Sequence, residues 1–397
     1  MPDYSRFNQS RGALKRILGL PQPGEWCRSA AEGMRVAWTL RHLPPLLVSF
    51  LLGAAVMFGV FVVSTRRSPP TSKLKPSAAI SGQVAKAGPT SLSQKIDRWL
   101  DARGHHLDAV MVQHRGTLVY SRVFNWFRAD QPHELQSATK TISSILIGIA
   151  LDDGLVKSLD QPVVELLPEY AALLVGEKAN VTVDHVLTMR TGLRWVDFGI
   201  GNSFERIEAA PDSVSFVLEE PLESKPGERF FYNTGSSHLL SAVVQRQTGL
   251  SAFEYAKRRL FEPLGITQVS WPSLSDGRTQ GGWGMYLSPE DMLKIGQMLS
   301  DGGMFGERRI VSKSYVDEMF KRRVETHLAA GYGYQLWLPD DHGHKGLGAA
   351  RGYGGQDIFV ARDLDLVVIF TGSIGTPERN AQDIRLLLKD VVMPSID

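Results

Sequence analysis

Two hairpin-like segments near opposite ends of the region 91–397 constrain the fold more than any other feature. Residues 109–122 and 358–370 each hold two short apolar runs separated by a turn of polar or Gly residues. This pattern is typical of a β-hairpin. Strands from both ends of a domain can join one antiparallel sheet. We therefore expect the chain to close a sheet from its two ends.

The stretch between these hairpins, from Ser137 to about Met319, is dominated by helical periodicity with Gly and Pro in the loops. The helices expected there cover 141–150, 183–188, 238–247 and 289–299, and further helices are expected at 93–103 and 381–392. The sequence predicts an α+β fold. Its antiparallel sheet is built from the N- and C-terminal parts of the domain, is flanked by helices, and has a largely helical inserted region. An active site is expected where the two parts meet.

Residues 43–65 carry no charged side chain and are rich in Leu, Val, Phe, Gly and Ala. At about 1.5 Å per residue, such a helix can cross the roughly 30 Å hydrocarbon layer, so we expect a transmembrane anchor. A cleaved signal peptide is the alternative, although the run exceeds a usual signal core. Residues 1–42 are then an N-terminal tail, and residues 66–90, rich in Pro, Ser and Gly, are a linker to the domain at 91–397.

The overall composition excludes several classes of partner. The chain has 44 Lys and Arg against 42 Asp and Glu, a formal net charge of +2, so nucleic acid is not expected as a partner. Its single cysteine, Cys27, allows no intrachain disulfide and no cysteine-rich metal site. The histidines lack metal-ligand spacing, and we expect neither a metal nor a cofactor. Basic residues on both sides of 43–65 leave the orientation of the anchor undecided.

Ser137 and Lys140 open the first helix of the middle region and lie on one helix face, a turn apart. The lysine amine can therefore reach the serine oxygen, and a half-buried lysine can lose its proton near neutral pH. The same spacing also fits a helix-capping serine beside a solvated lysine. The segment 72–75 repeats the pattern within the expected linker. The tetrapeptide alone does not distinguish these interpretations.

The residues around this pair resemble the class C β-lactamase-like serine hydrolases. The resemblance runs in order through 137–169, 181–195, 226–249, 287–291 and 352–372, and so covers nearly the whole region after residue 100. Residues 182–193 are similar to that family's segment T-x-x-H-L-L-T-M-x-S-G-L. The resemblance implies a β-lactamase/transpeptidase-like fold, with Ser137 as nucleophile and Lys140 as its activating partner.

A second motif of this family, Tyr-x-Asn, supplies a tyrosine that works with the lysine as general base. Tyr232 matches the tyrosine, whereas Thr234 stands where the asparagine is usual and Asn233 is displaced by one position. A hydroxyl would then replace the amide that holds the substrate carbonyl. Without the resemblance, Tyr232 could equally be a buried aromatic side chain in the core.

The third family motif, Lys-Thr-Gly or a relative, lies on a strand whose backbone N–H completes the oxyanion hole. The best match is Tyr353-Gly354-Gly355 followed by Gln356, with no lysine. The resemblance implies that the N–H groups of Gln356 and Ser137 bind the oxyanion. A simple Gly-rich turn before a hairpin is the alternative. Arg351 could attract a substrate carboxylate, but an exposed arginine is the simpler interpretation.

We expect a membrane-anchored serine hydrolase that cleaves a small ester or amide, similar to the 6-aminohexanoate-dimer hydrolases and esterases of this family. A β-lactamase or D-alanyl-D-alanine carboxypeptidase is the second interpretation. A catalytically silent domain that binds cell wall or protein is the third. The resemblance also implies a single-pass protein of the inner membrane with its catalytic domain in the periplasm or outside the cell. The sequence does not indicate an oligomeric state.

Overall fold

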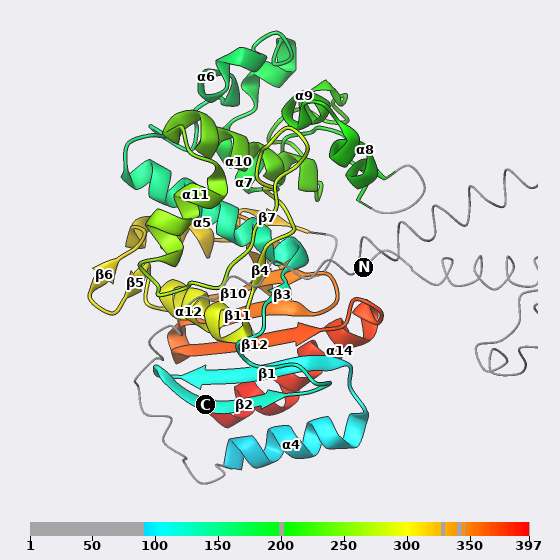
Figure 1. The fold of residues 1–397 in the computed structure, drawn as a ribbon, viewed down its shortest axis with the longest axis vertical. Helices are drawn as coiled ribbons and strands as arrows, with labels where there is room; N and C mark the ends of the chain where they lie inside the picture. The colour runs from blue at the N-terminus through cyan, green and yellow to red at the C-terminus, as the bar shows by residue number, and fades with distance from the viewer. Residues whose placement is uncertain (1–90, 198–201, 327–329, 340–343, 345, 397) are drawn as a thin grey trace, which may run out of the picture. The chain divides into compact units, whose positions relative to one another are not determined.

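The computed structural model describes residues 91–397 except 198–201, 327–329, 340–343, 345 and 397. Its main feature is an antiparallel sheet of eight strands in the order β2-β1-β12-β11-β10-β9-β8-β7 (Figure 1). The strands are β1 (Leu107–His114), β2 (Thr117–Val123), β7 (Val324–Glu325), β8 (Ala330–Tyr332), β9 (Trp337–Pro339), β10 (Leu347–Gly352), β11 (Gln356–Ala361) and β12 (Leu366–Gly372). The N-terminal strand β1 pairs with the C-terminal strand β12, so the two chain ends close the sheet.

Helices cover both faces of the sheet. On one face, α4 (Ser91–Arg103) and α14 (Pro377–Leu387) bury a compact apolar cluster that includes Ile96, Leu100 and Phe370. The other face carries the larger core and the helical region (Figure 1). Its helices are α5 (Thr139–Asp152), α6 (Val163–Leu166), α7 (Val183–Leu187), α8 (Ser203–Ala209), α9 (Ser213–Glu219), α10 (Thr234–Thr248), α11 (Ala252–Ala256), α12 (Pro289–Ser300) and α13 (Lys313–Met319).

The sequence-based fold class is confirmed. The two expected hairpins are β1–β2 and β11–β12, and the expected first helix is α4. The helix expected at 381–392 starts earlier, at Pro377, and continues as a π-helical turn through Val392. Strands β7 to β10 were not expected. Strands β7 to β9, on one side of the sheet, are only two or three residues long. Strand β10 reads Leu-Gly-Ala-Ala-Arg-Gly, without the β-branched and aromatic residues that favour strands.

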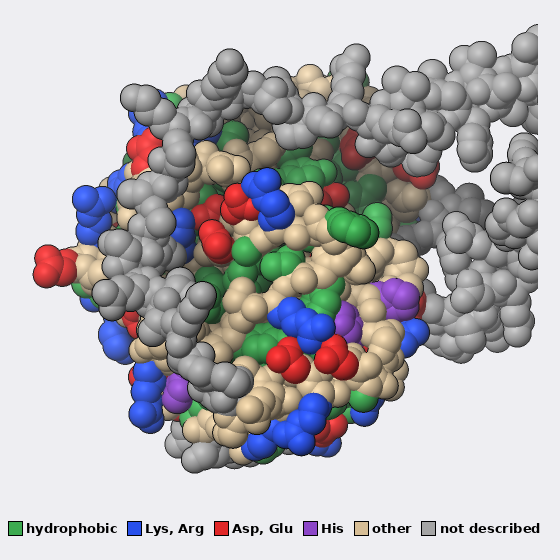
Figure 2. Space-filling view, turned by 60° about the horizontal axis from the view of Figure 1, so that its bottom comes forward, with side chains coloured by type: hydrophobic (Ala, Val, Ile, Leu, Met, Phe, Trp, Pro, Cys, Tyr) green, Lys and Arg blue, Asp and Glu red, His purple; other side chains and the backbone are tan. Residues whose placement is uncertain are grey.

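The anchor expected at 43–65 and the linker expected at 66–90 lie outside the described residues. Within the described part of the chain, no helix is both long and apolar enough to cross a membrane. Figure 2 views the molecule with the α4 end turned toward the reader, and basic and acidic side chains are interspersed over that face. Between β2 and α4, Arg122 forms ion pairs with Asp97 and Asp101, each at 2.9 Å.

Candidate active site

Ser137 lies between a short strand and α5, one of the two longest helices on the sheet face that carries the helical region. The strand β3 (His133–Glu134) pairs with β4 (Tyr286–Leu287), and a 3-10 turn, η2 (Gln136–Ala138), leads into α5. Gln136, just before the serine, has a φ of 50°, a left-handed backbone that non-Gly residues seldom adopt. Such backbone strain clusters at functional sites. The turn leaves Ser137 half-buried at the start of α5.

The structure brings Lys140 and Ser137 together as their spacing predicted. Lys140 Nζ lies 3.0 Å from Ser137 Oγ and 2.9 Å from the carbonyl oxygen of Gly282. The lysine side chain is buried, with 1% exposure. Burial lowers the pKa of Lys140 to about 7, while the negative charge of Asp197 acts in the opposite direction. The amine can therefore exist in its neutral, proton-accepting form at ordinary pH.

Tyr232 lies next to Lys140. Lys140 Nζ is 4.9 Å from the centre of the Tyr232 ring, which stacks on Trp337 at a centroid distance of 5.6 Å. Burial raises the pKa of Tyr232 above its ordinary value and the charge of Asp197 adds to this, whereas a hydrogen bond with Ser137 works against it. Tyr232 is therefore held as a neutral phenol, which can donate a proton but is a poor base.

Thr234 stands at the position of the usual motif asparagine and Asn233 precedes it, and the two side chains make different contacts. Asn233 caps α10: its Oδ1 accepts from the N–H of Ser236 at 2.7 Å, and its Nδ2 donates to the Leu193 carbonyl at 2.8 Å. It is thus bound into the helix start and the neighbouring loop. Thr234 is buried, and its hydroxyl helps to lower the pKa of Asp197, although its Oγ1 makes no hydrogen bond of standard geometry with any described residue. The hydroxyl at position 234 therefore faces a carboxyl group.

Asp197 is the site residue that the sequence did not reveal. Its Oδ1 accepts a hydrogen bond from Trp195 Nε1 at 2.9 Å. Burial raises the pKa of Asp197, while the charge of Lys140 and the hydrogen bonds from Thr234 and Trp195 favour the ionised form. Its position follows directly after the segment 181–195 that carried the resemblance, but no spacing pattern marks it in the sequence. Its electrostatic interaction with Lys140 arises only from tertiary packing.

The Gly-rich hairpin approaches the nucleophile through β10. A Cβ at Gly352 would lie 2.1 Å from the carbonyl oxygen of Leu135, so this strand end abuts the segment just before Ser137. Tyr353, Gly354 and Gly355 form the turn, and both glycines have positive φ (86° and 90°).

Gln356 and Arg351 take up different positions around this hairpin. Gln356 pairs with Gly352 across the hairpin, and its side-chain Nε2 donates to the Gly372 carbonyl at 2.6 Å. Arg351 points to the opposite face of the sheet, where its Nε lies 3.5 Å from Asp357. The arginine is therefore not beside Ser137.

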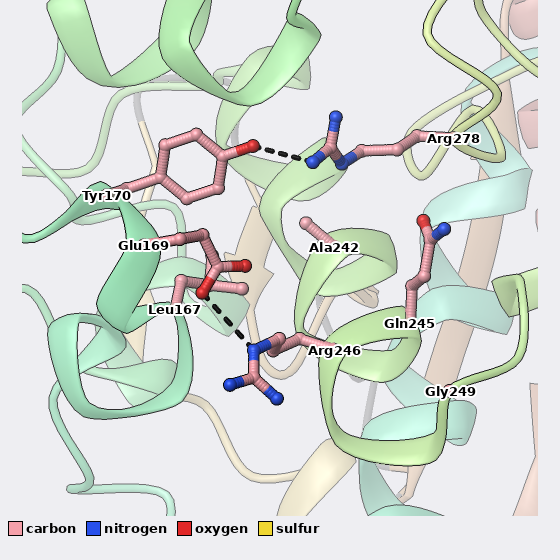
Figure 3. Close-up of a pocket in the computed structure, with 8 residues that line it drawn as sticks. All are labelled: Leu167, Glu169, Tyr170, Ala242, Gln245, Arg246, Gly249 and Arg278. Carbon is pink, nitrogen blue, oxygen red and sulfur yellow. Dashed lines mark hydrogen bonds and ion pairs between the residues drawn. The ribbon is translucent and has the colours of Figure 1, made fainter.

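A separate pocket lies at the far end of α10. It encloses about 340 Å³ and is lined by Leu167, Glu169, Tyr170, Ala242, Gln245, Arg246, Gly249 and Arg278 (Figure 3). Gln245 is eleven positions along α10 from Thr234, a rise of roughly 16 Å along the helix axis. This pocket is therefore distinct from the surroundings of Ser137. In the described part of the chain, no group of three or more His, Cys, Asp or Glu side chains could hold a metal ion.

A serine at the start of a helix, a buried lysine one turn away and an antiparallel sheet beside them define the class of β-lactamase-fold serine hydrolases. The comparison with protein families agrees, because the model described as Beta-lactamase matches residues 92–392. The chain belongs to this family.

Relatives and solved structures show which proteins this chain is similar to. It is 23% identical to a 6-aminohexanoate-dimer hydrolase of Paenarthrobacter ureafaciens, over 68% of this chain and 74% of that protein. It is 26% identical to a lovastatin esterase of Penicillium rubens, over 52% of this chain and 63% of that protein. Among solved structures, an octameric penicillin-binding protein homologue from Pyrococcus abyssi superposes with a TM-score of 0.59 at 22% identity, covering 75% of this chain and 76% of that one.

Proposed function

We propose that residues 91–397 hydrolyse a small ester or amide through an acyl-enzyme on Ser137. The observation that carries this proposal is the 3.0 Å contact between Ser137 Oγ and the amine of Lys140, a buried group whose pKa is lowered to about 7. A neutral amine within hydrogen-bond distance of a half-buried serine is a competent general base. The hydrolases and esterases among the relatives support the same reaction class.

In the first half of the reaction, Ser137 Oγ forms a bond to the substrate carbonyl carbon while its proton passes to Lys140 Nζ. The bond to the leaving alcohol or amine then breaks, and the leaving group takes a proton from the Lys140 ammonium or from the Tyr232 hydroxyl, which Lys140 reprotonates. In the second half, water attacks the acyl-enzyme, its proton passes to the amine, and Ser137 regains a proton as the acid is released. The phenol thus serves as a proton relay, and Lys140 is the base.

The oxyanion that forms in both steps needs two N–H donors. One is expected from Ser137 and the other from the hairpin of β10 and β11, where Gln356 remains the sequence-based prediction. The close approach of Gly352 to Leu135 makes the N–H of Tyr353, the next residue, a second candidate for this role. Either donor would stabilise the negative charge as it develops on the carbonyl oxygen.

The charges around Ser137 favour an uncharged substrate over a β-lactam or a D-alanyl-D-alanine peptide, both of which carry a carboxylate. The third motif at 353–355 has no lysine, and Arg351 forms an ion pair with Asp357 on the other face of the sheet. The carboxyl group of Asp197 acts electrostatically on Lys140. A substrate carboxylate would therefore meet the charge of Asp197, and Arg351, being held on the other face, offers it no cation.

The test is covalent labelling with a fluorophosphonate, which reacts with activated serines. The full chain should be labelled at Ser137, and Ser137→Ala should lose labelling while keeping the circular dichroism spectrum of the unmodified protein. Labelling that persists in Ser137→Ala would refute the assignment. Comparing turnover of nitrocefin with that of 4-nitrophenyl butyrate then separates a β-lactamase from an esterase, and we expect the ester to be preferred.

We also propose that residues 43–65 anchor this domain to the inner membrane with the catalytic part on the outer side. The support is the uncharged apolar run itself and the family resemblance. Protease protection of sealed spheroplasts checks the orientation. The proposal predicts that protease added outside digests the domain, and digestion only after lysis would contradict it.

A further inference from the structure

Gly281 and Gly282 form the segment that holds the amine of Lys140. The Gly282 carbonyl oxygen accepts from Lys140 Nζ at 2.9 Å. Both glycines lie tightly against α10: a Cβ at 281 would be 2.8 Å from the Cα of His238, and a Cβ at 282 would be 2.8 Å from Thr234 Cγ2. The place of this carbonyl is therefore set by its contacts with α10.

His238, on α10, makes two directed hydrogen bonds that fix its tautomer. Its Nδ1 accepts from the N–H of Gly281 at 3.2 Å, so Nδ1 carries no proton. Nε2 must then carry the proton, and it donates to Ser213 Oγ at 2.7 Å. The ring has 0% exposure, and burial lowers the pKa of His238 to about 4, which keeps the imidazole neutral at ordinary pH.

The chain of hydrogen bonds continues to an ionised anchor. Ser213 Oγ donates to Asp276 Oδ2 at 2.5 Å, and the Ser213 N–H reaches the same oxygen at 2.8 Å. Arg278 binds Asp276 at 2.9 Å and donates to the Tyr170 hydroxyl at 2.6 Å in the wall of the pocket of Figure 3. The hydrogen bonds from Ser213 and Arg278 outweigh burial and lower the pKa of Asp276 to about 2. The last group in this chain of hydrogen bonds is therefore a carboxylate.

We propose that His238, Ser213 and Asp276 are positioning residues of the active site, whose hydrogen-bond chain fixes Gly281–Gly282 and so holds the Lys140 amine against Ser137. We call this chain the His238 relay. It rests on the proposed function, since it takes Lys140 as the base. The relay acts through the Gly282 carbonyl, which fixes the position of the Lys140 amine and, as a hydrogen-bond acceptor, stabilises its ammonium form.

The charged and titratable groups that face the relay are distinct at its two ends. Asp276, Arg278 and Asp212 act on His238, whereas Asp197 acts on Lys140, whose amine also lies 4.9 Å from the centre of the Tyr232 ring. His238 itself titrates far below pH 6. A change in pH dependence near pH 7 therefore reports on Lys140.

The experiment measures the fluorophosphonate labelling rate of the full chain between pH 5.5 and pH 9. His238→Leu removes both hydrogen bonds of the ring. His238→Asn keeps a side-chain oxygen near the place where Nδ1 accepts from Gly281. Ser213→Ala breaks the relay at its next link and leaves His238 in place, and Ser300→Ala, a buried serine at the end of α12, is the matched control.

In His238→Leu we expect the maximal labelling rate to fall at least tenfold. The pH midpoint should move at least half a unit lower, because the ammonium loses an acceptor. His238→Asn should recover most of both changes, Ser213→Ala should show a smaller shift in the same direction, and Ser300→Ala should match the unmodified protein.

Two results would overturn the relay. The first is a folded His238→Leu variant whose midpoint stays in place or moves upward, whatever its rate; if that variant does not fold, an unmoved midpoint in Ser213→Ala decides equally. The second is equal loss in His238→Asn and His238→Leu, which would mean that only packing matters. Absence of labelling in the unmodified protein would instead refute the proposed function, and the relay's role with it.

Discussion

Gly352 stands so close to Leu135 that a Cβ at position 352 would lie 2.1 Å from the Leu135 carbonyl oxygen. Leu135 O also accepts the N–H of Ala138 at 3.0 Å, so this carbonyl belongs to the turn that presents Ser137. A methyl group at 352 must push strand β10 away from that turn. The end of β10 and the nucleophile are thus coupled by direct contact.

We predict that Gly352→Ala lowers kcat for 4-nitrophenyl butyrate by roughly 10²-fold, about the effect of losing one oxyanion donor. KM should change much less, because the contact concerns the transition state. Gly375→Ala is the control, since its Cβ would meet nothing closer than Ser373 Oγ at 3.5 Å. Full activity in a correctly folded Gly352→Ala protein would show that the strand end does not serve the reaction.

The pH dependence of hydrolysis follows from the buried amine of Lys140. Its pKa is lowered to about 7, and only the neutral amine can accept the proton of Ser137. The rate should therefore fall tenfold per pH unit below about pH 7 and level off above it. Lys140→Met should lower kcat by roughly 10²- to 10⁴-fold, the usual contribution of a general base. The exposed Lys157→Met serves as control, and an acid limb centred near pH 4 would contradict the assignment.

The sequence was sufficient for the features that depend on local pattern. Alternating apolar runs predicted both hairpins, and the i, i+3 spacing predicted that Lys140 reaches Ser137. Each of these depends on residues near one another in the chain, where backbone geometry alone fixes which side chains can meet.

The features that the sequence did not reveal depend on packing between distant segments. Asp197 acts on the charge of Lys140 from a loop, and the Gly282 carbonyl accepts a hydrogen bond from Lys140 in a second loop, which His238 contacts. Strand β10 was missed because its small residues have little strand preference; it is specified by its neighbours in the sheet. The sequence pattern places the third motif on the turn at 353–355, and the contact of the preceding strand end, at Gly352, with the segment before Ser137 is not marked by any pattern.

Replacing Asp197 by Asn should change both pH dependence and substrate charge preference. The Asp197 charge raises the pKa of Lys140, so its removal should shift the acid limb to lower pH. It should also raise kcat/KM for a carboxylate-bearing ester, 4-nitrophenyl hemisuccinate, roughly tenfold relative to the neutral butyrate; tenfold corresponds to about 1.4 kcal/mol. Glu208→Gln, an exposed change on α8, is the control. If neither the ratio of kcat/KM for the two esters nor the acid limb of the pH–rate profile changes, Asp197 is protonated or remote from the substrate.

Asp357 lies on the sheet face that α4 and α14 cover. Its buried carboxyl group leads to a prediction about stability rather than catalysis. Burial raises its pKa to about 6, with Arg351 acting in the opposite direction. Because the folded protein disfavours the carboxylate, the free energy of unfolding should fall as pH rises from about 4 to about 6 and then stay level. Asp357→Asn removes this titration. The variant should therefore gain about 3 kcal/mol relative to the unmodified protein between pH 4 and pH 8, since a shift of about two units corresponds to that energy.

Urea unfolding of both proteins at a series of pH values measures this difference directly. The exposed Asp160→Asn should leave the pH profile of the parent unchanged, because its carboxyl group is solvated in both states. A difference between Asp357→Asn and the parent that stays constant across this pH range would show that Asp357 titrates alike in the folded and unfolded chains. If the difference instead decreases as pH rises, the carboxylate is stabilised by its ion pair with Arg351 by more than burial costs.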